Sequence, residues 1–211
     1  MLDEHNIDWR SARRSAAGAT IVAEAWAAAR EHGLAGWSLR DLARRLGMAA
    51  PSLYSYFDSK HALYDAMYAD GWRSFLALGA PEPAEDVRTA LLNVERVYLR
   101  WAVEDPVRHQ LLNQRTIPGF EPSAESYAIA QEAYALSFSG LEALRELTQE
   151  DKDLVTAVFS GLLSQHFAND PGGTRWLSLL EDAVDLVVPR LEARPPRAAS
   201  AGVRPTPKGE R

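Results

Sequence analysis

Two kinds of hydrogen-bond donor gather in one short stretch, where the hydroxyl groups of Ser52, Tyr54 and Tyr56 are followed by the ammonium group of Lys60. Both kinds donate to phosphate oxygens, and such contacts position a protein on a nucleic acid without reading its sequence. The residues from Ala49 to Ser52 are small, so they allow close approach to bases, contact with a thymine methyl group and hydroxyl hydrogen bonds. The predicted chemistry is therefore binding: phosphates through the tyrosines and the lysine, bases through the small residues.

Two short helices are predicted to position this stretch. The first begins after Ser38, a suitable N-cap, and ends at Gly47, which can adopt a left-handed backbone. Leu39 and Leu42 lie on its apolar face. Pro51 suits the first turn of the second helix, because a missing N–H is tolerated there. Together they form a helix-turn-helix pattern, in which the second helix enters a DNA major groove.

The predicted DNA contacts combine this second helix with the outward side of the first. Arg40 and Arg44 lie on that outward side, where they either contact base edges or phosphates or form an ordinary solvated surface. The second helix contains no Arg, Asn or Gln, the residues that make bidentate contacts with base edges. The complete predicted set is Ser38, Arg40, Arg44, Ala49, Ala50, Pro51, Ser52, Tyr54, Ser55, Tyr56 and Lys60.

The same stretch resembles the DNA-binding domain of the TetR family of bacterial transcriptional repressors, over roughly residues 14 to 64. In that family a glycine turn and a recognition helix of small residues are followed by Leu-Tyr-x-(aromatic or His)-Phe and then by x-x-Lys-x-x-Leu. These positions are occupied here by Gly47, Leu53, Tyr54, Tyr56, Phe57, Lys60 and Leu63. Ala49 departs from the family, which usually carries a Ser or Thr cap there, so a weak N-cap is predicted.

The resemblance implies a homodimer that binds a roughly palindromic operator in double-stranded DNA, with half-sites about one turn (~34 Å) or slightly more apart. It also implies a body that encloses a small-molecule effector, whose binding moves the DNA-binding domains and releases the repressor. Residues from Asp105 to Ser123 resemble part of a C-terminal subtype seen in actinobacterial members. The alternative is a dimeric module that binds a small molecule or partner and has weak or lost DNA binding, which Ala49 and the missing base-reading amides favour.

Helical periodicity continues along the chain, and no strand pattern interrupts it. We predict an all-α fold of about nine helices, which end near Arg30, Leu46, Phe57, Leu78, Glu104, Leu112, Leu147, Ala168 and Leu191. The predicted domains are a flexible arm (1–12), a three-helix helix-turn-helix DNA-binding domain (13–60), a helical ligand-binding and dimerisation domain (61–193) and a disordered basic tail (194–211).

Charge is distributed unevenly over the 211 residues, whose net charge is −6. From Arg10 to Lys60 eight basic side chains stand against four acidic ones, whereas residues 61–193 carry ten basic and twenty-one acidic side chains. A basic head on an acidic body is the electrostatic layout of a DNA-binding protein with a separate body.

Aromatic and polar residues of the body are the candidate lining of the effector cavity, because they combine apolar bodies with polar tips. For each of them ordinary core packing is the alternative. They are Met67, Tyr68, Trp72, Tyr98, Trp101, His109, Gln114, Tyr127, Tyr134 and Phe138.

The last two predicted helices, at 151–168 and 174–191, carry apolar stripes wider than one neighbouring helix would cover. A two-fold four-helix bundle with a second copy of the chain would bury them. The predicted dimer interface is Val155, Phe159, Leu162, His166, Trp176, Leu180, Val184 and Val187.

Enzyme and cofactor sites are not indicated. None of the five histidines pairs with another at metal-binding spacing, and His61 with Asp65 forms at most a solvated helix pair. The sequence has no phosphate-binding glycine motif and no nucleophile elbow, so a hydrolase has no convincing nucleophile and base. The absence of cysteine fits a reducing compartment, and no apolar run is long enough for a membrane span, so we expect a cytoplasmic protein without cofactor.

Overall fold

The structure is a computed structural model that describes residues 3–197. Within that range the chain forms nine α-helices and one 3-10 helix, and its β-structure is limited to an isolated bridge between Arg145 and Pro196. The helices are α1 (Asp3–His32), α2 (Leu39–Arg45), α3 (Ala50–Tyr54), α4 (Lys60–Leu76), α5 (Val87–Glu104), α6 (Pro106–Asn113), α7 (Ala124–Leu144), α8 (Gln149–Asn169), η1 (Leu177–Leu179) and α9 (Leu180–Glu192). The predicted all-α fold is confirmed.

Local sequence signals account for the boundaries around α2 and α3. The Ser38 hydroxyl accepts from the Asp41 backbone N–H at 3.2 Å, and the Asp41 carboxylate accepts from the Ser38 N–H at 3.1 Å, which completes a capping box. Gly47 has φ +63°, the left-handed conformation that ends a helix cleanly. Pro51 lies in the first turn of α3, and Ala49 caps that helix without a side-chain hydrogen bond.

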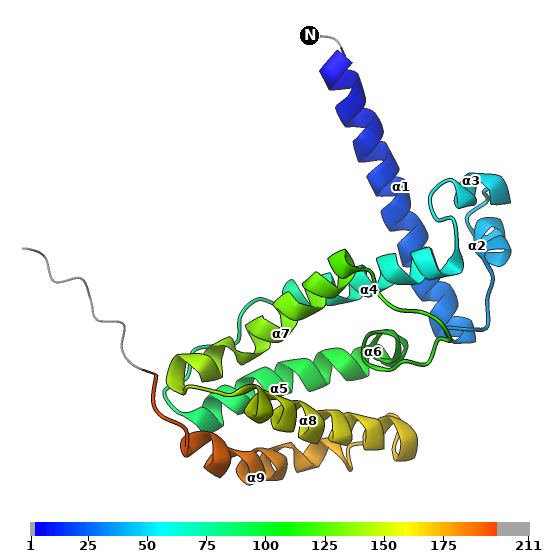
Figure 1. Ribbon diagram of the computed structural model, residues 1–211. Coiled ribbons are helices and arrows are strands. Elements are labelled where there is room, and N and C mark those ends of the chain that lie inside the picture. Colours follow the sequence, from blue (N-terminus) through cyan, green and yellow to red (C-terminus); the bar gives the residue numbers. More distant parts are fainter. Residues whose placement is uncertain (1–2, 198–211) are drawn as a thin grey trace, which may run out of the picture.

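Two predicted segments differ in the structure. The chain is already helical from Asp3, so residues 3–12 of the predicted arm are part of α1, which extends away from the rest of the molecule (Figure 1). The helix predicted to begin near Thr174 instead starts as η1 and becomes α9 only at Leu180. Residues 198–211 of the predicted tail lie outside the described residues.

Two hydrophobic cores organise the molecule. We call the first the head core; it joins α1, α2, α3 and the first half of α4, and it includes Leu42, Leu53 and Leu63. The second, the body core, joins the rest of α4 to α5, α7, α8 and α9. Helix α4 belongs to both, since Met67 packs in the head core and Phe75 in the body core. The predicted domain boundary at residue 60 therefore falls at the start of α4, although later residues of α4 such as Leu63 and Met67 still belong to the head core.

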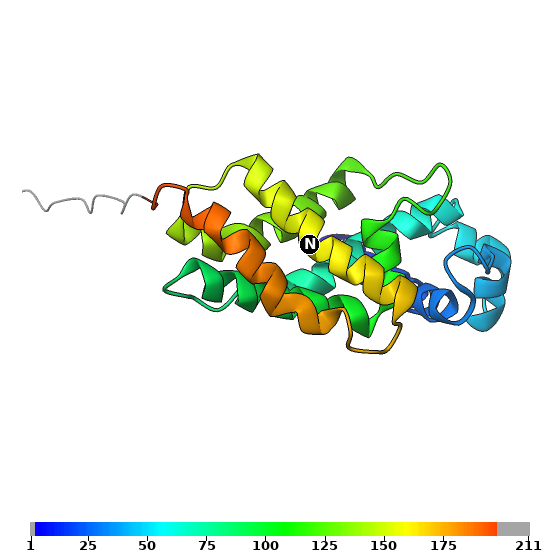
Figure 2. The ribbon, with the colours of Figure 1, turned by 90° about the horizontal axis from the view of Figure 1, so that it is seen from below.

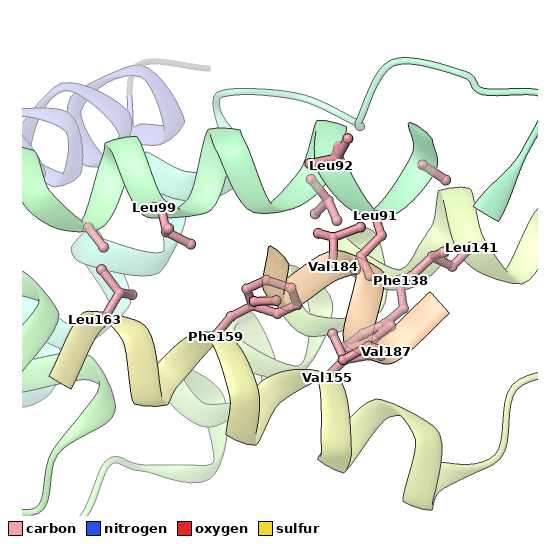
Figure 3. Packing of buried hydrophobic residues seen from close by; sticks show 14 of the residues in the cluster. Leu91, Leu92, Leu99, Phe138, Leu141, Val155, Phe159, Leu163, Val184 and Val187 are labelled. Carbon is pink, nitrogen blue, oxygen red and sulfur yellow. The ribbon is translucent and has the colours of Figure 1, made fainter. Parts of the chain in front are cut away.

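Side chains from four helices interlock in the body core (Figure 3). Leu91 of α5, Phe138 of α7, Phe159 of α8 and Val184 of α9 are all buried there. Burying a large apolar side chain stabilises the folded chain by about 1.5–3 kcal/mol, so this cluster holds the body together. No helix in the described part of the chain is both long and apolar enough to cross a membrane.

The residues predicted for the dimer interface are mostly covered by the chain itself. Five of them, Val155, Phe159, His166, Val184 and Val187, are buried within the chain itself. Leu162, Trp176 and Leu180 are half-buried. The apolar stripes of α8 and α9 pack in one core with α5 and α7. The chain's own helices therefore bury most of the apolar surface that the prediction assigned to a second subunit.

A different set of apolar residues on α8 and α9 faces outward. Helices α8 and α9 lie side by side on one face of the body (Figure 2). Leu154 of α8, Leu179 of η1 and Leu186 of α9 are exposed, and Leu186 keeps 80% of its surface accessible.

Candidate nucleic-acid interface and ligand cavity

Helix α3 is anchored by one buried apolar residue and presents small and polar side chains on its outward face. Leu53 is completely buried in the head core, and it fixes the rotation of this five-residue helix. Pro51 and Ser52 are exposed, and Tyr54 keeps 45% of its surface accessible. Ser55 is also exposed, but its hydroxyl donates to the Ser52 carbonyl at 2.7 Å. The outward face of α3 can therefore offer a hydroxyl, a phenol and a close backbone approach to a partner.

Basic residues flank α3 on two sides. Arg40 is exposed on α2, and the Arg44 side chain is 81% exposed and lies 2.9 Å from Asp41. Arg14 of α1 donates to the Ser55 carbonyl at 2.6 Å, and its guanidinium lies 5.2 Å from the centre of the Tyr56 ring. Sequence reasoning counted Arg14 among the basic residues of the head without giving it a contact. The geometry places its charge directly beside the predicted recognition helix.

Lys60 is engaged inside the head. Its ammonium group donates to the Trp37 carbonyl at 2.5 Å and to the Ala35 carbonyl at 3.3 Å, and it lies 4.3 Å from the centre of the Trp37 ring. Burial lowers the pKa of Lys60, since the charged form loses hydration. The predicted phosphate contact of Lys60 would require this ammonium group to leave both carbonyls, whereas Tyr54 needs no rearrangement.

Three polar contacts tie the head to the body. Arg30 of α1 donates from Nε to Asp105 at 2.9 Å and from Nη2 at 2.7 Å, and Asp105 is the N-cap of α6. Trp26 of α1 donates to Asp70 of α4 at 2.8 Å. Asp65 of α4 accepts from the Ser123 backbone N–H at 2.7 Å at the start of α7. The position of the head therefore depends on α4, α6 and α7.

A cavity lies between α4, α5, α6, α7 and α8 and encloses about 640 Å³ of empty space, part of which opens to solvent. Four predicted ligand-binding residues line it: Trp72, Tyr98, Tyr134 and Phe138. Their rings come from three different helices, so the cavity depends on the body fold rather than on one local motif.

A second cavity adjoins the first, because Asn113 at the end of α6 lines both. Tyr68, Gln114 and Tyr127 of the predicted set line this one. Its wall includes the loop between α6 and α7, in which Arg115 is exposed.

Three predicted ligand-binding residues line neither cavity. Met67 is completely buried in the head core. Trp101 is buried and donates to the Ser74 hydroxyl at 3.2 Å. His109 is buried against Asn113, and burial lowers its pKa to about 4. For these three, the alternative of core packing describes the structure.

Glu95 is the one carboxyl-bearing residue among the lining residues that the sequence prediction did not include. It lies on α5 between Leu91 and Tyr98, lines the first cavity and keeps only 8% of its surface accessible. Its Oε2 atom is fully buried and has no hydrogen-bond partner among the described residues. Burial raises the pKa of Glu95 to about 8. The signal was available in the sequence, because Glu95 lies four residues after Leu91 and three before Tyr98, on the same helical face.

The described part of the chain has no group of three histidine or acidic side chains that could hold a metal ion. Asp65 instead binds Ser123 and Ser126, and the His61 ring lies 6.1 Å from that of Phe120.

Comparison with known proteins gives a consistent result. Residues 21–67 match the family model described as bacterial regulatory proteins, tetR family. An HTH-type transcriptional regulator of Mycobacterium bovis is 29% identical over 119 residues, which are 54% of this chain and 50% of that protein. The chain thus spans about half the length of the curated relatives it matches.

Solved structures share the fold over most of the chain. The regulatory protein SCO4313 superposes with a TM-score of 0.68 at 22% identity, over 85% of this chain and 98% of the other. A variant of TetR from Acinetobacter baumannii AYE, in complex with minocycline, superposes with a TM-score of 0.54 at 19% identity, over 82% of this chain and 95% of the other. At these identities the likeness concerns the fold.

Proposed function

We propose that this chain, a member of the TetR family of bacterial regulatory proteins, is a dimeric transcriptional repressor that binds a palindromic operator in double-stranded DNA and is released by a small molecule. The observation that carries the proposal is the presentation of α3. Leu53 anchors this helix in the head core, whereas Ser52 and Tyr54 face outward beside the charge of Arg14. A short helix with small outward residues suits the major groove of DNA, which a bacterial repressor meets in the cytoplasm.

The dimer that this function needs is proposed to form through the outward face of α8, η1 and α9. Leu154, Leu179 and Leu186 supply exposed apolar surface there. Two copies related by a two-fold axis would bury these leucines in a four-helix arrangement. The two heads would then be able to contact successive half-sites.

Ligand control is proposed to act through α4. Trp72 of α4 lines the first cavity, and Leu63 of the same helix packs in the head core. A ligand that repacks Trp72 therefore moves a helix that the head shares. It lowers operator affinity if it binds more tightly to the arrangement of heads that does not fit DNA. A structural neighbour crystallised with minocycline supports a ligand-binding role for bodies of this fold.

The test is binding to the DNA that flanks the gene, measured over a range of salt concentrations. The wild-type chain should have a preferred site with nanomolar affinity and a steep salt dependence. Tyr54→Phe should weaken binding to all sites alike, because it removes a phosphate contact, whereas Ser52→Ala should change the order of preference among sites. Tyr127→Phe removes an equivalent hydroxyl from the body and should leave DNA binding unchanged.

The alternative function, a dimeric module that binds a small molecule or partner with weak or lost DNA binding, is favoured by one observation. Ala49 offers no side-chain cap to α3, so that helix begins without the hydrogen bond that would hold its first turn. A shallow salt dependence without any preferred site would support this alternative over the repressor. Uniform loss of affinity in both Ser52→Ala and Tyr54→Phe would contradict the proposed division between base and phosphate contacts.

A further inference from the structure

The carboxyl group of Glu95 is buried without full hydrogen bonding from the described residues. A buried carboxylate is costly unless a hydrogen-bond donor or a cation compensates for its lost hydration. Glu95 is 8% exposed, and its enclosed Oε2 atom has no such donor within residues 3–197. Stability alone does not require a carboxyl here, because an apolar side chain of similar volume would fill the position at lower cost. The cavity beside Glu95 provides room for a compensating group.

The other walls of that cavity are aromatic or neutral. Trp72, Tyr98, Tyr134 and Phe138 contribute aromatic rings, whose faces attract cations. Small hydroxyl groups complete the polar lining; they belong to Ser137 of α7 and to Thr156 and Ser160 of α8. Asn113 is the lining residue from α6, and its side-chain oxygen accepts from the Tyr98 hydroxyl at 3.2 Å.

Charged groups around Glu95 are few. The titratable side chains that line the cavity are Glu95 and Tyr98 on α5 and Tyr134 on α7. The contributions from α4, α6 and α8 to this lining are uncharged. Lys152 of α8 approaches from outside, with its ammonium group 5.7 Å from the centre of the Phe138 ring, and it is ion-paired with Glu142. The carboxyl of Glu95 is thus the only carboxyl group among the residues that line this cavity.

We infer that the cavity binds an organic monocation with a flat apolar body, and that Glu95 pairs with its ammonium group. The inference rests on the proposed ligand-binding role of the body and specifies the chemical class of the ligand. The rings would pack against the apolar part of the ligand, while the ammonium N–H groups would donate to the buried carboxylate. An anion would meet an uncompensated carboxyl, so the same geometry selects against acidic ligands.

Binding of a cation should also displace a proton. Since burial raises the pKa of Glu95 to about 8, the empty cavity holds a mostly protonated carboxyl at pH 7. A neighbouring ammonium group favours the ionised form, so the proton leaves as the ligand enters. Close to one proton should be released per ligand bound at pH 7.

Three probes with the same ring system test the inference: 2-(1-naphthyl)ethylamine, 2-(1-naphthyl)ethanol and 1-naphthaleneacetate. They differ chiefly in charge and are titrated calorimetrically into the full chain. The wild type should bind the amine at least about tenfold more tightly than the alcohol, and the acetate most weakly. Glu95→Gln keeps the side-chain volume and should abolish the preference for the amine. Glu132→Gln makes the same change of charge at an exposed position of α7 and should retain it.

Proton release is measured on the wild type alone, by repeating the amine titration at pH 7 in two buffers with different ionisation enthalpies. Equal affinity for amine and alcohol would overturn the inference, as would a preference that persists in Glu95→Gln or an amine titration without proton release. Failure of all three probes to bind at millimolar concentration would also overturn it. Circular dichroism of each variant confirms that it is folded.

DNA binding of the same preparations separates this inference from the proposed function. If the amine binds through Glu95 but leaves operator affinity unchanged, the ligand class stands and the proposed release mechanism fails. If operator binding is intact but the chain shows no preference for the amine, the repressor proposal stands and the inferred ligand class is wrong.

Discussion

The buried carboxyl of Glu95 should make the stability of the protein fall as the pH rises. Burial raises its pKa from 4.5 to about 8 in the folded chain. Between these values the folded state binds a proton that the unfolded state has lost, so the free energy of unfolding decreases with pH. The contribution is fully present below pH 4.5 and is lost by about pH 8.

A second buried group has the opposite effect at lower pH. Burial lowers the pKa of His109 from 6.5 to about 4, so the unfolded state binds the extra proton between these values. That contribution raises stability as the pH rises towards 6.5 and then stays constant. Above pH 6.5 little of this change is left, and the difference between the wild type and Glu95→Gln isolates Glu95. One pKa unit corresponds to about 1.4 kcal/mol and the slope falls to half at pH 8, so roughly 1.5 kcal/mol should be lost from this group across the interval.

Urea denaturation at several pH values between 6.5 and 8, at constant protein concentration, measures this loss. The wild type should lose roughly 1.5 kcal/mol more unfolding free energy than Glu95→Gln, which is a substantial part of the 5–15 kcal/mol typical of folded proteins. Glu95→Gln should show an almost constant value, and Glu132→Gln should follow the wild type. Parallel decreases in wild type and Glu95→Gln would refute the reasoning, because the titrating group would then lie elsewhere.

Three further predictions concern other parts of the molecule. Asp151→Asn should lower the free energy of unfolding in urea by about 2–4 kcal/mol. It removes the charge of a fully buried carboxylate that belongs to the capping box of α8 and pairs with two arginines. Leu186→Glu should yield folded monomers in sedimentation velocity, and a persistent dimer would exclude the outward face of α9 as its interface. Arg30→Gln should reduce the effect of ligand on operator affinity, measured by fluorescence anisotropy, because it weakens the link between α1 and α6; an unchanged ligand effect would count against that link.

The helix-turn-helix could be predicted because its determinants are local. A capping residue such as Ser38 and a turn glycine such as Gly47 act on the backbone within a few residues, whatever the rest of the chain does. The residues proposed to face DNA follow from the rotation of a helix whose anchor, Leu53, is evident in the sequence. The contact of Arg14 with α3 joins positions 41 residues apart, and no local signal indicates it.

An apolar stripe could not predict which residues a second subunit would cover. Such a stripe shows that a helix face is covered, but it does not show whether the cover is another helix of the same chain or a second subunit. Val155 and Val184 are covered within the chain, while Leu186 stands 80% exposed. The same limit applies to the cavity. Helical register predicts that both Trp72 and Trp101 face the interior of the body, but of the two only Trp72 lines the first cavity.

Polar contacts lead from Glu95 in the body to the head. Its neighbour Tyr98 donates to Asn113 at the C-terminal end of α6, and Asp105 at the other end of α6 holds Arg30 of the head. Burial, together with the charge of Glu95, raises the pKa of Tyr98, so its hydroxyl remains a donor in the physiological pH range. A ligand that ionises Glu95 changes the electrostatic environment of Tyr98 and hence the anchoring of α6. We expect coupling along this route to need no large movement, because a short helix with a defined polar contact at each end joins the cavity to the head.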